Sequence, residues 1–110
     1  TNRIKKAEIV IPGENEVTNE GISYLARLKG LRELDLKNLL IDDECLPDLT
    51  KIKTLEWLHI RSTKISSAGV ERILEELPAL KTLIFSIDDE ALGEALQQKY
   101  QDKELSFNCR

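Results

Sequence analysis

Apolar residues recur along this chain with a period of 24 or 25 positions. A fixed period in this range indicates a solenoid, in which each repeat is one supersecondary unit that buries its apolar side by stacking on its neighbours. We therefore expect function to reside on a surface and not in an interior pocket. Three copies define the repeat: Leu28, Leu31, Leu34, Leu36 and Ile41; Ile52, Leu55, Leu58, Ile60 and Ile65; and Leu77, Leu80, Leu83 and Phe85.

Each copy begins with the pattern of a helix. A residue able to cap a helix N-terminus comes first, because its side-chain oxygen accepts a backbone N–H of the first turn. Gly or Cys follows three positions later, and then apolar residues at intervals of three and four predict one buried helix face. The predicted caps are Thr18, Asp42 and Ser66, the small residues are Gly21, Cys45 and Gly69, and the apolar stripes are Ile22, Leu25 and Leu28; Leu46, Leu49 and Ile52; and Val70, Ile73, Leu74 and Leu77.

The apolar period then changes from helical spacing to two. Alternation of this kind predicts a short strand with one buried face. The inward pairs are Leu34 and Leu36, Leu58 and Ile60, and Leu83 and Phe85.

Both ends follow the same order of elements in less regular form. Residues 7–11 alternate like a strand, and residues 12–16 form a turn. Near the C-terminus, Asp88 can cap a helix, and residues 104–108 can form a last strand. We predict one α/β domain over residues 1–110, with about five parallel strands and about four helices: an N-terminal strand and turn (1–16), three regular repeats (17–87) and a C-terminal cap (88–110), whose helix turns Leu92, Ala95, Leu96 and Tyr100 inward.

The segments 31–38, 55–62 and 80–87 resemble the strand signature of the leucine-rich repeat family, with Asn38 at the family's Asn/Cys position. Ser62 and Ile87 depart from that residue type, so the turns after the second and third copies are expected to be less regular. The helix openings with Gly or Cys are similar to those of the cysteine-containing and bacterial subtypes. The resemblance implies a right-handed α/β solenoid with strands on its concave face and α-helices on its convex face.

Charge and composition argue against several classes of partner. With 20 acidic and 16 basic residues, the chain has a net charge of −4 and lacks the basic field that nucleic-acid binders use. Anionic membranes are disfavoured for the same reason, and no apolar run approaches the roughly 20 residues that span a bilayer. Two cysteines without a disulfide framework favour a reducing, intracellular setting, and we expect the cytoplasm.

The sequence offers little for catalysis. It holds a single histidine, His59, and no Cys/His spacing that matches a metal site. Carboxylates cluster at residues 42–44 and 88–90, where the dipole of a predicted helix stabilises negative charge. We therefore predict a chain that is not an enzyme and has neither a metal nor a cofactor.

Cys45 occupies the position that is glycine in the other two copies. We interpret it as a small buried thiol, since free cysteine packs as a small hydrophobe. The alternative is a reactive thiol whose pKa is lowered by the helix N-terminus. A disulfide between Cys45 and Cys109 would have to cross several repeats, and we do not expect it.

The residues that alternate with the buried strand positions point to a binding surface. Parallel strands in one register place equivalent residues about 4.8 Å apart, so Trp57, His59, Arg61 and Ile84 are expected to be contiguous. Trp and Arg are enriched in interface hot spots. The candidate partner-binding residues on the concave face are Glu33, Asp35, Lys37, Trp57, His59, Arg61, Thr82 and Ile84, with Glu8 expected beside Glu33, Val10 beside Asp35, and Glu104, Ser106 and Asn108 on the last strand.

Other interpretations remain open for two of these side chains. Trp57 can be covered by the N-terminal segment or stack beneath Arg61 as a cation–π pair. His59 can be a solvated strand histidine, or it can make an interface sensitive to pH.

We predict a non-catalytic module that presents a rigid concave sheet to a protein partner. One alternative is a structural C-terminal cap of a longer leucine-rich repeat protein, with further repeats upstream. Another is an accessory subunit of an enzyme complex, or a substrate adaptor of the ubiquitin-ligase type, which the resemblance to the cysteine-containing subtype implies.

Overall fold

The computed structural model describes residues 6–8, 19–27 and 30–109, which form an α/β fold around a parallel sheet. Consecutive strands are neighbours in the sheet, and each pair is parallel. Four strands with described side chains make up most of it: β2 (Glu33–Asp35), β3 (Trp57–His59), β4 (Thr82–Ile87) and β5 (Glu104–Cys109). A segment of three residues, β1 (Lys6–Glu8), pairs with β2 at one edge.

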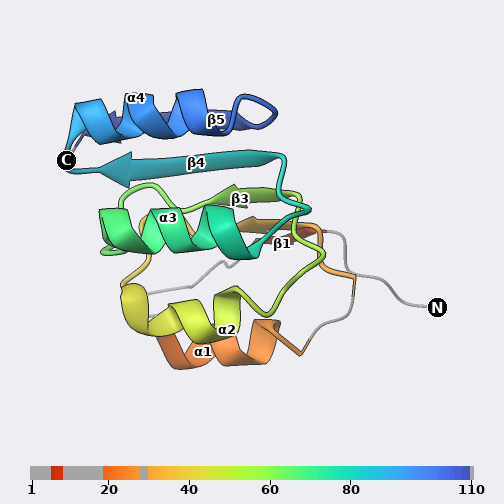
Figure 1. The fold of residues 1–110 in the computed structure, drawn as a ribbon. Coiled ribbons are helices and arrows are strands. Elements are labelled where there is room, and N and C mark those ends of the chain that lie inside the picture. Colours follow the sequence, from red (N-terminus) through yellow and green to blue (C-terminus); the bar gives the residue numbers. More distant parts are fainter. Residues whose placement is uncertain (1–5, 9–18, 28–29, 110) are drawn as a thin grey trace.

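A helical segment lies between each pair of successive strands, and Figure 1 shows these segments as a layer beside the strands. None of the described helices is both long enough and apolar enough to cross a membrane. The helical segments are α1 (Asn19–Leu25), the 3-10 turn η1 (Asp43–Cys45), α2 (Leu46–Leu49), α3 (Ser67–Glu76) and α4 (Glu90–Lys99). The prediction of one continuous second helix with a stripe reaching Ile52 is wrong, because the segment opens as a 3-10 turn and α2 ends at Leu49.

Side-chain caps begin the helical segments as the sequence predicts in two cases. Asp42 accepts a hydrogen bond from the backbone N–H of Glu44 at 2.9 Å, and Ser66 Oγ accepts one from Gly69 at 3.1 Å. The last helix is capped by Asp89, which accepts from the N–H of Ala91, and not by Asp88. The predicted cap at residue 18 lies outside the described residues.

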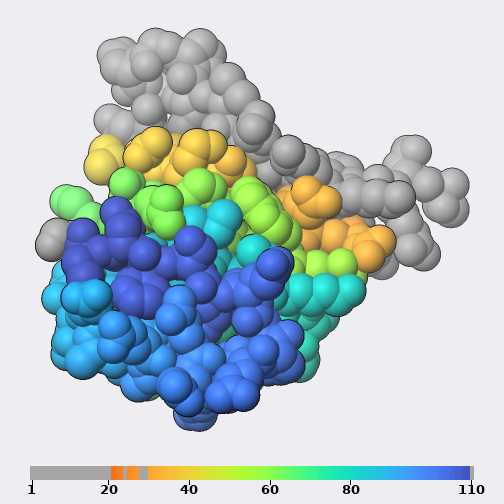
Figure 2. Space-filling model, turned by 90° about the horizontal axis from the view of Figure 1, so that it is seen from above, coloured from red at the N-terminus to blue at the C-terminus, as the bar shows by residue number. Residues whose placement is uncertain are grey.

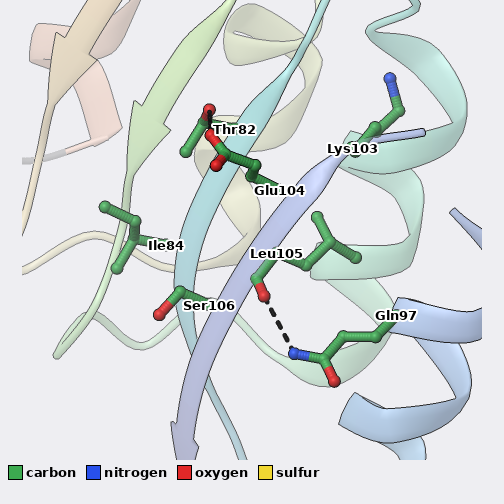
Figure 3. Close-up of a pocket in the computed structure, with 7 residues that line it drawn as sticks. All are labelled: Thr82, Ile84, Gln97, Lys103, Glu104, Leu105 and Ser106. Carbon is green, nitrogen blue, oxygen red and sulfur yellow. Dashed lines mark hydrogen bonds between the residues drawn. The ribbon is translucent and has the colours of Figure 1, made fainter. Parts of the chain in front are cut away.

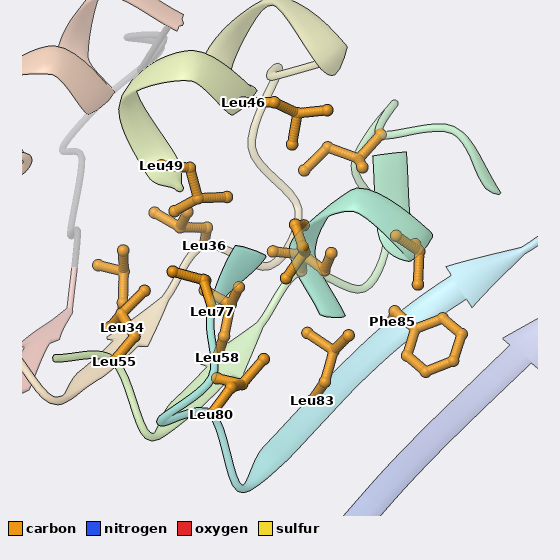
Figure 4. Packing of buried hydrophobic residues seen from close by; sticks show 14 of the residues in the cluster. Leu34, Leu36, Leu46, Leu49, Leu55, Leu58, Leu77, Leu80, Leu83 and Phe85 are labelled. Carbon is orange, nitrogen blue, oxygen red and sulfur yellow. The ribbon is translucent and has the colours of Figure 1, made fainter. Parts of the chain in front are cut away.

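The face of the sheet toward the helices is fully apolar. Its six predicted inward residues are at most 1% exposed, so the alternation of the strands is confirmed: Leu34, Leu36, Leu58, Ile60, Leu83 and Phe85. The apolar stripes of the helices pack on them, with Leu46, Leu49 and Leu77 directed toward the leucines of the strands (Figure 4). This continuous core holds the strands in one register and so orders the opposite face.

The register of β1 differs from the predicted one by two residues. The sequence placed Glu8 beside Glu33, whereas Lys6 pairs with Glu33 and Glu8 pairs with Asp35. A shift of two keeps every side chain on its own face, so alternation alone cannot exclude it. Residues 9–11 of the predicted strand, with Val10, lie outside the described residues.

Two turns after the strands adopt the left-handed conformation. Asn38 has φ 66° and Ser62 has φ 63°. The second turn therefore has the same conformation as the first, contrary to the expectation from its serine. After the third copy, β4 continues to Ile87 and pairs with β5 along six residues, so no comparable turn forms there.

The C-terminal unit of α4 and β5 closes one end of the core. Phe107 of β5 stacks on Phe85 with ring centroids 5.7 Å apart. Ala95 is exposed, contrary to prediction, and Gly93 is buried, because the Phe107 ring occupies the space beside it. Seen from above, atoms of α4 and β5 cover this end of the molecule (Figure 2).

Candidate functional site

The side of the sheet away from the core carries the eight predicted binding residues, and we call it the open face. Strand register aligns Glu33, Trp57 and Thr82 in one row. The second row is Asp35, His59 and Ile84. Lys37 and Arg61 follow the ends of β2 and β3, where the N–H of Asn38 still donates to the carbonyl of Arg61 at 3.0 Å.

Trp57 is half-buried near the middle of the open face. Its ring meets that of His59 edge-on, with centroids 5.9 Å apart and planes at 90°. Arg61 extends in another direction, because its Nη2 donates to Ser106 Oγ of β5 at 3.4 Å. The structure therefore places Trp57 against His59, and not beneath Arg61 as one alternative had it. The other alternative, cover by the N-terminal segment, falls largely on residues outside the described ones.

Asp35 is more deeply buried than a residue of an open surface, at 9% exposure. Lys37 Nζ donates to its carboxylate at 2.6 Å, and the backbone N–H of Lys37 donates at 3.2 Å. Burial alone would raise the pKa of Asp35, but these hydrogen bonds and the charges of Lys37 and His59 outweigh it and lower the pKa. Asp35 is thus an ionised, already paired group beneath the surface.

His59 lies beside this pair, with Nδ1 3.7 Å from Asp35 Oδ1 and its side chain 16% exposed. Burial lowers its pKa, and the positive charges of Lys37 and Arg61 lower it further, against the opposing effect of Asp35. The imidazole is therefore neutral at pH 7. The interpretation of His59 as a solvated strand histidine is wrong.

Two buried nitrogen atoms of the open face have no hydrogen-bond partner among the residues that the structure describes: His59 Nε2 and Arg61 Nε. Buried polar atoms in native proteins are nearly always paired, and each exception calls for an explanation. Both atoms belong to residues that the sequence predicts as binding residues. Because both atoms have almost no exposed surface, a ligand can pair them only after the two side chains turn outward.

An ion-pair ladder crosses the beginnings of the strands. Arg32 holds Glu56 through two hydrogen bonds, at 2.8 and 3.1 Å, and Lys81 lies 3.8 Å from the same carboxylate. The sequence reasoning missed this ladder, although the three residues occupy the same position in successive repeats and alternate in charge. The ladder borders the open face with side chains that already have partners.

A shallow pocket continues the open face toward β5 and α4 (Figure 3). Gln97 of α4 donates to the carbonyl of Leu105 at 2.9 Å, and Thr82 donates to Glu104 at 3.2 Å. The sequence reasoning did not assign Gln97 or Lys103 to any site. The pocket is lined by Thr82, Ile84, Gln97, Lys103, Glu104, Leu105 and Ser106.

The cysteines do not add reactive chemistry. Burial raises the pKa of Cys45 to about 12, and the negative charges of Asp42 and Asp43 add to the effect. The alternative of a thiol activated by a helix N-terminus is therefore wrong. Cys45 is buried, Cys109 is exposed, and both are free.

Within the part of the chain that the structure describes, no group of three His, Cys, Asp or Glu side chains could hold a metal ion. Carboxylates of the two acidic clusters accept local hydrogen bonds. Asp42 and Asp89 cap helical segments, and Asp43 accepts from the N–H and the hydroxyl of Ser66. No family model matches this chain, and the search of curated proteins found no match.

Proposed function

We propose that this chain is a solenoid domain of the leucine-rich repeat type that binds a protein through its open face. Support for the repeat type comes from the agreement of sequence period and register. Leu34, Leu58 and Leu83, which are 24 and 25 residues apart, pair across three strands. The left-handed residues Asn38 and Ser62 likewise stand 24 positions apart, at equivalent turns.

The observation that carries the binding proposal is the contiguity of Trp57, His59 and Arg61 on one face of the sheet. A few hot-spot residues supply most of the affinity of a protein interface, and Trp and Arg are enriched among them. The leucine core beneath them fixes the strands, so little conformational entropy is lost when a partner binds. Rigid display of these side chains is the proposed mechanism.

A non-catalytic role agrees with the chemistry of the same residues. His59 is mostly buried, and its Nδ1 faces Asp35, which Lys37 already holds. Cys45 is a buried thiol with a raised pKa. Two free cysteines also fit a reducing compartment, and we propose that the protein acts inside the cell, in the cytoplasm.

The test is affinity capture from a lysate with the wild-type chain and with Trp57→Ala. We expect the variant to lose capture of a discrete partner by about tenfold or more, as for a hot-spot residue. Leu40→Ala is the matched control, because Leu40 is 59% exposed and lies in the bend after β2, not on a strand. Equal capture by both variants would refute the proposal, provided that thermal unfolding shows each variant to be folded.

A second candidate is a structural cap at the C-terminal end of a longer repeat protein. It is favoured by α4, whose outer side carries the exposed residues Glu94, Gln98 and Lys99 and whose Gln97 bonds to the edge strand β5. Terminal repeats need such a polar outer side. Self-association of the isolated chain that Trp57→Ala leaves unchanged, with no partner captured, would favour this role.

A further inference from the structure

The two unpaired nitrogens of the open face indicate the chemistry of its partner. We propose that the open face binds an acidic segment, with an Asp or Glu carboxylate of the partner accepting hydrogen bonds from His59 Nε2 and Arg61 Nε. This inference rests on the proposed function, because it names the partner class for the same surface. Neither nitrogen has a partner among the described residues.

Strand geometry brings the two side chains to one place. His59 and Arg61 are two positions apart along the chain, so they project from the same face. The Nδ1 edge of the His59 ring faces Asp35, which leaves Nε2 directed away from that carboxylate. Arg61 reaches toward Ser106 through a long bond of 3.4 Å, which a stronger acceptor can replace as the side chain moves.

The hydrogen-bonding capacity of these atoms favours a carboxylate. Arg61 Nε can only donate, and protonated His59 donates from both nitrogens. One carboxylate with two oxygens can accept from both residues through charge-assisted bonds. A partner hydroxyl or backbone N–H that donates to neutral His59 would leave Arg61 Nε unpaired, so it explains only half of the observation.

The local charge agrees with an anionic ligand, although the whole chain carries −4. The charged groups that interact with His59 are Asp35, Lys37 and Arg61, which sum to one net positive charge (two positive, one negative). Lys37 binds Asp35 at 2.6 Å, so this carboxylate is already compensated. The half-buried Trp57 beside His59 offers an apolar wall for the methylene groups of a Glu side chain.

The experiment is an NMR titration of the intact, ¹⁵N-labelled chain with a hexaglutamate peptide. Hexaserine and hexalysine serve as controls at matched ionic strength. We expect hexaglutamate alone to shift the Nε–H resonance of Arg61 and to raise the pKa of His59 by about one unit, since a nearby opposite charge favours the protonated ring. Equal shifts with hexaserine, or no shift at either residue, would overturn the inference.

Charge-matched variants separate a specific site from general attraction. Arg61→Gln should weaken hexaglutamate binding about tenfold, the effect of losing a charge-assisted hydrogen bond. Lys64→Gln removes an equal charge from an exposed side chain that the structure does not place on the open face, and should change binding less than twofold. Equal losses in the two variants would overturn the site.

The outcomes distinguish this inference from the proposed function. If Trp57→Ala abolishes capture of a protein while hexaglutamate leaves Arg61 and His59 unshifted, the open face binds a protein of other chemistry and only the acidic partner is refuted. If Trp57→Ala leaves capture intact, the proposed function fails whatever the peptide does. Circular dichroism of Arg61→Gln checks that a loss of binding is not a loss of fold.

Discussion

The groups around His59 determine its pKa. Its ring contacts Trp57, its Nδ1 faces Asp35, and its buried Nε2 has no partner in the described part of the chain. Since Lys37 and Arg61 also lower its pKa, protonation is unfavourable in the free protein. His59 is thus neutral in the free protein, and a bound carboxylate would favour its protonation.

The lowered pKa of His59 predicts how stability depends on pH. An unfolded chain protonates this histidine near its ordinary value of 6.5, whereas the folded chain does so only at lower pH. Stability is therefore complete above about pH 6.5 and falls as the pH drops toward the folded pKa. Urea unfolding at pH 7.5 and pH 5.0 should show this loss in the wild type and a smaller one in His59→Gln.

His59→Gln removes the whole histidine contribution to this pH dependence, because the chain has one histidine. Asp35 also has a lowered pKa, but its contribution is present above its ordinary value of 3.8 and is lost only below it. An undiminished loss between pH 7.5 and 5.0 in His59→Gln would show that another group is responsible.

Ser62 predicts a gain in stability at the same scale. At φ 63° it adopts the left-handed conformation, which disfavours any residue with a Cβ. Ser62→Gly should stabilise the chain by about 0.5 kcal/mol, because relief of this strain exceeds the extra entropy of glycine in the unfolded chain. Ala68→Gly, at an exposed position of α3, should instead destabilise by about 0.5–1 kcal/mol. Urea midpoints that shift in the same direction for both would contradict the account.

At the scale of elements, α4 and β5 form a cap whose fit depends on one glycine. A Cβ at Gly93 would lie 2.5–2.8 Å from three atoms of the Phe107 ring. That ring is stacked on Phe85 and cannot retreat without breaking the stack. The close contact explains why Gly93 is buried in a helix whose predicted inner residue was Ala95.

Gly93→Ala should therefore destabilise the chain by about 1–3 kcal/mol through overpacking, although glycine-to-alanine changes inside helices usually stabilise by about 1 kcal/mol. Urea unfolding measures the change. Glu94→Ala, at the exposed neighbouring position, should stay within about 0.5 kcal/mol of the wild type. Combining Gly93→Ala with Phe107→Leu should recover part of the loss, and additive losses would exclude the ring as the cause.

At the scale of the whole molecule, the sequence predicts the features that depend on the spacing of the strand leucines. The spacing of Leu34, Leu58 and Leu83 predicts the parallel register, and the alternation around them predicts which side chains share the open face. The same spacing recurs in each repeat, so the register of each of these strand pairs is predicted independently of the others. We propose the family from the period and register of the strands, and the binding role from the chemistry of Trp57, His59 and Arg61.

The sequence could not predict features that depend on distances between side chains. Examples are the hydrogen bond between the buried Asp35 and Lys37, and the position of the Phe107 ring beside Gly93. The predicted register of β1 was wrong by two residues, because a shift of two keeps each side chain on the same face of the sheet. The cap of α4 was predicted at Asp88, whereas the adjacent Asp89 accepts the hydrogen bond from the first turn.

The most direct test of the central claim, that the open face binds a protein, is site-specific photocrosslinking. A benzophenone side chain placed at Glu33 samples the open face, and one at Glu75 samples the exposed side of α3. We predict that Glu33 crosslinks, in a lysate, to the same protein whose capture depends on Trp57, and that Glu75 does not. Crosslinking of that protein from Glu75 and not from Glu33 would contradict the account and place binding on the helices.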